Sequence, residues 1–233
     1  MRRLIAKGLR ARPMRFALCV GGIAVSTLLV LVLFASYRSV AASIRRYTGQ
    51  RGLDIWVGAK GTDNLIRSSG VFDVTTLEEV RRVPGVARVD PILRAFVTAE
   101  AKGRRFTLLG VSFRAPNGLG GPPLLERGRT PAASGEVALD QSAAHRLRIN
   151  IGDMLAVNGV SMKVVGITSG TNLLATQFVF GKIDLDGPGA LPLASFGIVE
   201  VAAGANASDV FCQGRCHLRI RITLTRSAIK KPP

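Results

Sequence analysis

One uninterrupted apolar stretch, residues 16–37, constrains this chain more than any other feature. The stretch FALCVGGIAVSTLLVLVLFASY has 22 residues and no charged side chain. As a helix rising about 1.5 Å per residue it would be roughly 33 Å long, enough to cross the hydrocarbon core of a bilayer. A cleaved signal peptide has a shorter apolar core, and a buried core helix is rarely apolar on every side. Both remain alternatives, but we interpret the stretch as one uncleaved transmembrane helix.

The charges on either side of this helix predict its orientation. Residues 1–15 form a basic N-terminus with six Arg or Lys side chains and no acidic residue, which favours a cytoplasmic location. Four arginines follow the helix, but long domains cross the membrane with little regard to charge. We therefore expect the N-terminus in the cytoplasm, the helix in the cell (inner) membrane as a single pass, and the main domain in the periplasm or outside the cell. Residues 1–15 form either an amphipathic segment on the membrane surface or a solvated basic end.

The net charge of +17 does not indicate a nucleic-acid-binding protein. Six of the positive charges lie in residues 1–15 and six in residues 212–233, so residues 38–211 are only mildly basic. Nucleic-acid-binding domains carry their positive charge as a patch on the folded surface, with aromatic residues among the basic ones. Trp56 is the only tryptophan of the chain, and no recognised binding motif is present. We expect no nucleic-acid partner.

The residues that follow the apolar stretch predict a helical stalk and a β-α-β-β unit. The stalk covers residues 38–52, with glycines near its end, and a strand is expected at residues 53–57. The segment TTLEEVRRVPGV predicts a short helix capped by Thr75 or Thr76, with Glu78 or Glu79 as the capping-box partner. An extended strand over residues 86–99, with an edge or bulge at Pro91, then turns at Lys102-Gly103 into a strand beginning at Arg104. Together, residues 53–113 form the first subdomain.

A second subdomain is expected after a Gly- and Pro-rich linker at residues 114–135. It covers residues 136–205 as a small β-rich module, and Asn158-Gly159 predicts a type I′ hairpin turn within it. The expected elements are a strand at 136–140, a helix at 141–147, the hairpin strands around 158–159, and strands at 177–181 and 196–202. Residues 206–233 are a basic tail of atypical composition. The expected fold class is α+β, with a transmembrane helix and stalk followed by this two-part domain outside the cytoplasm.

The tail contains the residues that most resemble a metal or haem site. Cys212, Cys216 and His217 have the spacing C-x3-C-H, one residue longer than the attachment signal of a c-type haem. A closed zinc site would need a fourth ligand, and the chain has only one other histidine. We interpret these residues as incidental or as a chance disulfide, and assign no metal and no cofactor.

Two further groups of polar residues do not indicate catalysis. Asp140, Ser142 and His145 lie at one strand–helix junction without a G-x-S-x-G motif, where Ser142 is expected to cap the helix. Asp184 and Asp186 stand beside Gly187-Pro188, and such a pair is typical of a solvated turn. We assign no catalytic residue and expect that the chain is not an enzyme.

The apolar stretch also has a face of small residues. Gly21, Gly22 and residues 24–26 would allow close approach of another helix in the membrane. This favours a membrane partner.

Several of these segments together resemble the permease subunits of the MacB/FtsX-like superfamily of ABC transporters. They are the basic end RARPMR, the long first span, the segment TTLEEVRRVPGVARVDPIL, and GEVALDQSAAHRLRINIGDMLAVNGVSMKVVGI. The resemblance covers residues 1–205 and rests on the order of these segments. It implies a domain outside the cytoplasm that moves when a cytoplasmic ATPase hydrolyses ATP, for export or release of a substrate.

The resemblance also implies partners and an incomplete chain. The implied partners are a cytoplasmic ABC ATPase subunit, the lipid bilayer, a second permease in a homodimer or heterodimer, and a periplasmic adaptor. Members of the family have three further spans, whereas no second apolar run of about 18 residues follows here. We therefore interpret the chain as a permease subunit, or a truncated fragment of one with an out-of-frame tail. The alternative is a single-span anchored binding or scaffold module without an ATPase partner.

Overall fold

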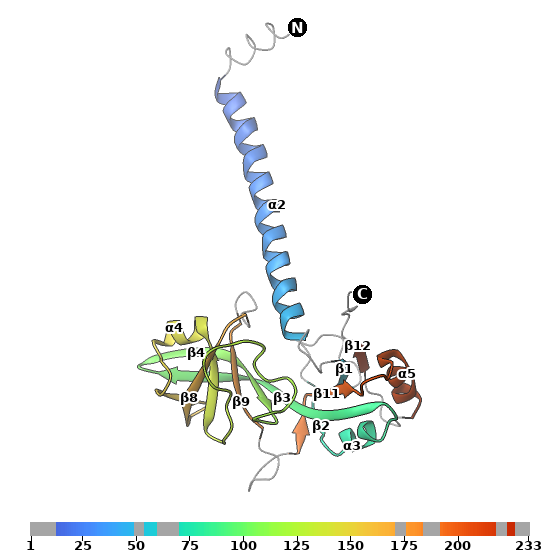
Figure 1. Ribbon diagram of the computed structural model, residues 1–233. Helices are drawn as coiled ribbons and strands as arrows, with labels where there is room; N and C mark the ends of the chain where they lie inside the picture. The colour runs from blue at the N-terminus through green and yellow to red at the C-terminus, as the bar shows by residue number, and fades with distance from the viewer. Residues whose placement is uncertain are drawn as a thin grey trace. The chain divides into compact units, whose positions relative to one another are not determined.

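The computed structural model describes residues 13–48, 54–59, 70–170, 176–183, 192–217 and 223–226. The chain divides into two compact units, residues 1–42 and 43–233. The expected features of residues 1–12, the glycines at the end of the stalk, and Asp184 and Asp186 lie outside the described residues. Figure 1 labels the helices and strands used below.

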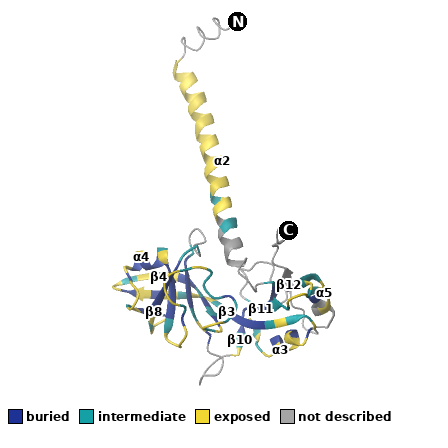
Figure 2. Cartoon of the chain, in the orientation of Figure 1, coloured by how far each residue is buried: buried dark blue, intermediate teal, exposed yellow. Residues whose placement is uncertain are grey.

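The first unit is built on helix α2 (Pro13–Thr48). It contains the whole apolar stretch 16–37 and continues through most of the segment expected as a stalk. Pro13 stands at the first helical position, where its missing N–H costs nothing. Within α2, residues Pro13–Ser39 are long and apolar enough to span a membrane. In Figure 2 the residues of this segment are coloured as exposed, apart from Ser36, which is of intermediate exposure.

The second unit contains mixed sheet and short helices, which confirms the α+β fold class. Its first elements are β1 (Ile55–Gly58), β2 (Phe72–Asp73), α3 (Thr76–Arg81), β3 (Val86–Ala101), β4 (Arg104–Phe113), β5 (Leu125–Gly128), β6 (Glu136–Asp140) and α4 (Gln141–Leu147). They are followed by β7 (Met154–Val157), β8 (Val160–Thr168), β9 (Phe178–Lys182), β10 (Leu193–Ala194), β11 (Phe196–Val201), α5 (Ala207–His217) and β12 (Thr223–Arg226).

Six strands close into a barrel. Following the hydrogen bonds, the ring runs β3–β4–β9–β6–β8–β7 and back to β3. The closing step pairs β7 with the end of β3, where Ala99 is opposite Val157. All six strands contribute buried side chains to one apolar cluster, so this cluster fills the interior of the barrel. Helix α4 adds Ala143, Ala144 and Leu147 to the same cluster.

The N-terminal half of β3 belongs to a second layer outside the barrel. There the sheet continues in the order β3–β11–β1–β12. One face of these strands is covered by α3 and α5, which bury Leu77, Val80 and Val210 in a common cluster. Burying one such side chain contributes about 1.5–3 kcal/mol. Figure 1 shows the barrel and the α3–α5 layer at opposite ends of β3.

Both two-residue hairpin turns expected from the sequence are present. Lys102 and Gly103 have φ values of 50° and 71°, and Asn158 and Gly159 have 48° and 84°. Positive φ at both central residues is the requirement of a type I′ turn. These turns connect β3 to β4 and β7 to β8.

The caps of the two short helices differ from the sequence prediction. Thr75 precedes α3 but makes no side-chain cap, and Asp73 Oδ1 accepts the hydrogen bond of the Thr75 N–H at 2.8 Å. At α4 the cap is Asp140, whose Oδ1 accepts from the Ser142 N–H at 2.9 Å. Ser142 is therefore two positions too late to be the cap. In both cases an aspartate two residues earlier presents its carboxylate to the N–H.

The arrangement of strands also differs from a simple succession of two subdomains. Strand β11, from the second expected subdomain, lies between β1 and β3 of the first. The segment expected as a linker contains β5, which pairs with β8. Residues 206–233, expected as an atypical tail, contain α5 and β12, and β12 pairs with β1. Pro91 faces Gly197 of β11 and precedes the pairing of β3 with β4, so its missing N–H interrupts no β3–β4 bond.

Candidate functional site

Helix α2 has the surface of a membrane-spanning helix. Leu18, Ile23 and Leu28 are 69%, 70% and 62% exposed. A continuous apolar surface of this kind would be unfavourable in water. The two hydroxyl groups near its middle are satisfied inside the helix. Ser26 Oγ donates to the Gly22 carbonyl at 2.9 Å, and Thr27 Oγ1 donates to the Ile23 carbonyl at 2.8 Å. These two hydroxyl groups are therefore satisfied without a partner outside the helix.

The small-residue face predicted for the helix is open in the structure. A Cβ added at Gly21 or Gly22 would have no heavy atom within 4 Å. Cys19, on the same helix, is an exposed free thiol. The face is thus available to a neighbouring helix.

Asp140 has a structural role at the start of α4. It is buried and its Oδ1 accepts from the Ser142 N–H, whereas the His145 side chain is exposed in the last turn of the same helix. A nucleophile–base pair needs both side chains within hydrogen-bonding distance. The predicted lack of a catalytic role for Asp140, Ser142 and His145 stays a prediction.

The described residues contain no group of three His, Cys, Asp or Glu side chains that could hold a metal ion. Cys212 is an exposed free thiol on α5. The side chains of Cys216 and His217 lie outside the described ones, so their predicted lack of a metal role stays a prediction.

A cavity of about 90 Å3 is present among the barrel strands. Its lining includes Val97, Val157 and Met162, and three glycines leave the space open. An engineered apolar cavity that binds benzene has about 150 Å3, and drug-sized ligands need several hundred. The barrel cavity can therefore accept no more than a few heavy atoms and is no cofactor site.

A carboxylate beside this cavity ties two segments together. Glu136, at the start of β6, forms a two-pronged ion pair with Arg129, with 2.7 Å between Arg129 Nη1 and Oε2. Its Oε2 also accepts from the N–H groups of Ala132 and Ala133 at 3.0 and 3.2 Å. The hydrogen bond from Arg129 is the largest cause that lowers the pKa of Glu136 from 4.5 to about 2. This arrangement fixes the turn that leads from β5 into β6.

A second ion pair joins the β3–β4 turn to the segment after α4. Lys102 Nζ lies 2.8 Å from Asp153 Oδ2 and donates to the Arg148 carbonyl at 2.8 Å. The hydrogen bond from Lys102 is the largest cause that lowers the pKa of Asp153. Arg104 Nη1 donates to the Arg146 carbonyl at 2.8 Å. These cations satisfy carbonyl groups at the C-terminal end of α4, as basic side chains commonly do.

A buried carboxylate, Asp90, lies on β3 between the two layers. Its side chain is 3% exposed, pairs with Arg88 Nη2 at 2.7 Å, and accepts from the Leu119 N–H at 2.9 Å. Arg114 Nε lies 3.8 Å from Asp90 Oδ1. Asp90 was not predicted as a candidate residue, although an aspartate inside the apolar run of a strand could have indicated one. Its contacts fasten residues 114–119 onto β3.

The comparisons with known proteins agree with this architecture. The family model of the MacB-like periplasmic core domain matches residues 16–210. The chain is similar to the periplasmic region of MacB from Actinobacillus actinomycetemcomitans, with a TM-score of 0.55 and 14% identity over 77% of this chain and 92% of that one. It is also similar to the extracellular domain of the noncanonical ABC-type transporter YknZ from Gram-positive bacteria, with a TM-score of 0.54 and 12% identity over 75% and 99%.

At these identities the two solved structures show the likeness of fold alone. No curated protein matches the chain. The match to the family model, however, covers most of the sequence and includes the apolar helix as well as the barrel and its flanking layer. The predicted resemblance is thereby confirmed, and the chain belongs to the family of the MacB-like periplasmic core domain.

Proposed function

We propose that this chain is a membrane subunit of a MacB/FtsX-like ABC transporter. It couples ATP hydrolysis by a cytoplasmic partner to motion of its barrel domain outside the cytoplasm, for export or release of a substrate. The chain itself performs no catalysis in this proposal. The observation that carries it is the order of elements in one family match: a membrane helix followed directly by a MacB-like core domain.

The interior of the described domain supports a mechanical role. The barrel is filled by aliphatic side chains, and its cavity of about 90 Å3 is too small for a typical ligand. Charged groups such as Glu136, Asp153 and Asp90 connect segments of the chain to one another. A closely packed barrel suits the transmission of force from a partner better than the binding of a small substrate in its interior.

The experiment is purification of the tagged full chain from its native membranes in mild detergent. We expect an ABC ATPase, recognised by its G-x-x-x-x-G-K-[ST] phosphate loop, to copurify and the complex to hydrolyse ATP. The variant Gly21→Leu with Gly22→Leu blocks close helix approach and should lower recovery of membrane partners, since the side chains fit without clash within α2.

A matched control adds bulk elsewhere on the same helix. Val30→Leu with Val32→Leu keeps the apolar character and leaves the small face intact, so recovery of partners should be unchanged. If the chain is recovered without any ABC ATPase and ATP hydrolysis stays at background, the proposal is wrong. The anchored binding or scaffold module would then be the better interpretation.

A further inference from the structure

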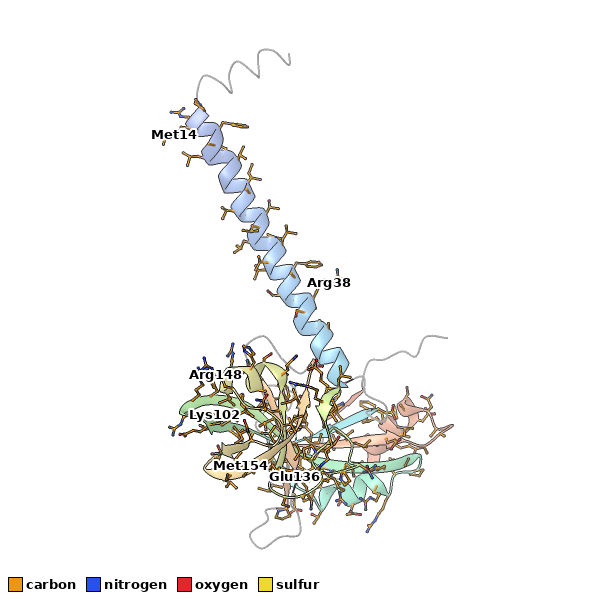
Figure 3. All side chains as sticks on the ribbon, turned by 60° about the vertical axis from the view of Figure 1, so that its left-hand side comes forward. Met14, Arg38, Lys102, Glu136, Arg148 and Met154 are labelled. Carbon is orange, nitrogen blue, oxygen red and sulfur yellow. The ribbon has the colours of Figure 1, made fainter. Side chains whose placement is uncertain are left out.

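One end of the barrel gathers basic side chains from two distant parts of the sequence. The bonds of Lys102 and Arg104 to the carbonyls of Arg148 and Arg146 hold the β3–β4 turn against the C-terminal end of α4. Figure 3 shows Lys102 and Arg148 close together at this end. We call the following set the α4-end surface: Lys102, Arg104, Arg146, Arg148, Ile151 and Met154.

The α4-end surface carries more basic side chains than its ion pairs and side-chain hydrogen bonds account for. Lys102 and Arg104 satisfy α4 carbonyls, and Asp153 neutralises one of the cations. The neighbouring Arg105 is paired with Glu100 at 2.7 Å. Among the described residues, no ion pair involves the exposed side chains of Arg146 or Arg148. The charges of these two side chains are therefore not neutralised by an ion pair within the described part of the chain.

Large apolar side chains lie beside these arginines. Ile151 is 43% exposed and lies in the turn after α4, and Met154 is 54% exposed and begins β7. Asp153, between them in sequence, is held by Lys102. Basic side chains flanking exposed apolar ones are the composition of surfaces that lie in a membrane interface, where headgroups pair with the cations and the acyl boundary receives the apolar groups. A purely acidic protein surface would leave Ile151 and Met154 in contact with water or polar groups.

A short segment of the chain tethers the domain to the candidate membrane span. Fourteen residues separate Ser39, at the end of the candidate span, from Asp54, the first described residue of the domain's sheet region. Even fully extended, that segment reaches no farther than about 50 Å. A tethered surface therefore meets the bilayer at a high effective concentration, so that weak attraction suffices for docking.

We propose that the α4-end surface docks on the anionic phospholipid headgroups of the bilayer that holds the chain's own helix. The proposal rests on α2 spanning that bilayer and not on an ATPase partner. A basic residue near an anionic membrane surface favours the bound state by about fivefold, the equivalent of about 1 kcal/mol. Arg146 and Arg148 together should therefore shift the ratio of docked to undocked domains by about thirtyfold.

The experiment measures the distance of this surface from the lipid in the full chain. An environment-sensitive fluorophore is attached to Asn150→Cys, in a chain whose three native cysteines are alanine, and the protein is placed in nanodiscs with nitroxide-labelled headgroups. Asn150 is exposed and belongs to none of the charged or apolar positions in question. We expect strong quenching with about a third phosphatidylglycerol and little with phosphatidylcholine alone. Salt at about 1 M, where the screening length falls to about 3 Å, should reverse it.

Two matched controls make the result specific. Arg146→Gln with Arg148→Gln should abolish the lipid-dependent quenching, whereas Arg82→Gln with Lys182→Gln removes the same charge from exposed positions elsewhere and should leave it. A fluorophore at Glu78→Cys on α3 should report no dependence on lipid charge. Equal quenching in both lipids, or a neutralised pair that behaves as the unchanged chain, would overturn the proposal. Absence of quenching in both lipids also overturns it and leaves an acidic protein as the partner to seek.

Discussion

Replacing Glu136 by glutamine should destabilise the barrel domain at neutral pH but hardly at all in acid. Glutamine keeps the size and one acceptor oxygen but loses the charge that pairs with Arg129. The lowering of the Glu136 pKa from 4.5 to about 2 sets an upper limit of about 3 kcal/mol, because each pKa unit is worth about 1.4 kcal/mol. The Arg129 side chain is 55% exposed, so solvent screens the pair, and we expect about 1–2 kcal/mol.

The pH dependence has a definite sign. The folded-state pKa lies below the ordinary value, so the carboxylate contributes its full stabilisation above about pH 4.5. That contribution is lost as the pH falls from 4.5 towards 2, where Glu136 becomes protonated in the folded state as well. The difference in stability between Glu136→Gln and the unchanged chain should therefore shrink over this interval.

The assay is urea unfolding of the full chain in non-ionic detergent, followed by tryptophan fluorescence. Trp56 is the only tryptophan and is buried in the core of the sheet, so its signal reports unfolding of the domain. Glu79→Gln is the matched control, because Glu79 is exposed on α3 and its side chain has no described partner. An equal loss for both variants at pH 7, or a Glu136→Gln effect that does not shrink in acid, would refute the reasoning.

Three further predictions concern packing, the buried carboxylate and the membrane helix. Gly197→Ala should destabilise the domain by about 1–3 kcal/mol in the same unfolding assay, because its Cβ would lie 2.4 Å from Leu77 Cδ2. Asp90→Ala should cost about 1–3 kcal/mol and speed hydrogen exchange at the Leu119 amide, since it leaves that part-buried N–H without its acceptor. Leu28→Arg should reduce membrane retention after alkaline extraction, because a central arginine costs about 2.5–3.5 kcal/mol in a spanning helix.

Each of these changes has a counterpart that should have little effect. Gly181→Ala meets its nearest atom at 3.9 Å and should leave stability within about 0.5 kcal/mol of the unchanged chain. Glu100→Ala removes a carboxylate from an exposed pair and should leave the Leu119 amide unaffected. Ser39→Arg places the new charge at the end of the candidate span and should keep the chain in the membrane. Equal effects within any of these pairs would contradict the corresponding prediction.

Local patterns predicted much of the secondary structure but not the helix caps. The type I′ turn at Asn158-Gly159 was predictable because asparagine and glycine tolerate positive φ, whereas at Lys102-Gly103 the sequence predicted a turn but not its type. The caps were predicted on threonine and serine, but the N–H groups of Thr75 and Ser142 are bound by the aspartates two residues earlier. Either residue type can accept the N–H bond, and only the backbone path decides which oxygen is within reach.

Of the candidate sites, one was weighed from the sequence and another emerged only from the structure. The sequence argued against catalysis by Asp140, Ser142 and His145, and this stays a prediction. The α4-end surface was invisible in the sequence, since Lys102 and Arg148 are far apart along the chain. Their proximity depends on a hydrogen bond between a turn and a helix end, which exists only after the barrel has closed.

The sequence by itself determined the long apolar helix and the α+β character of the domain. Both depend on interactions between residues that are close in the chain: the continuous apolar run that fills one helix, and the alternation and turn residues that define hairpins. The tertiary structure alone decided that β11 lies between β1 and β3, that β4 runs parallel to β9, and that β7 closes the barrel against β3. These pairings join segments distant in sequence, and their register follows from which side chains fill the shared core, a condition that no local pattern contains.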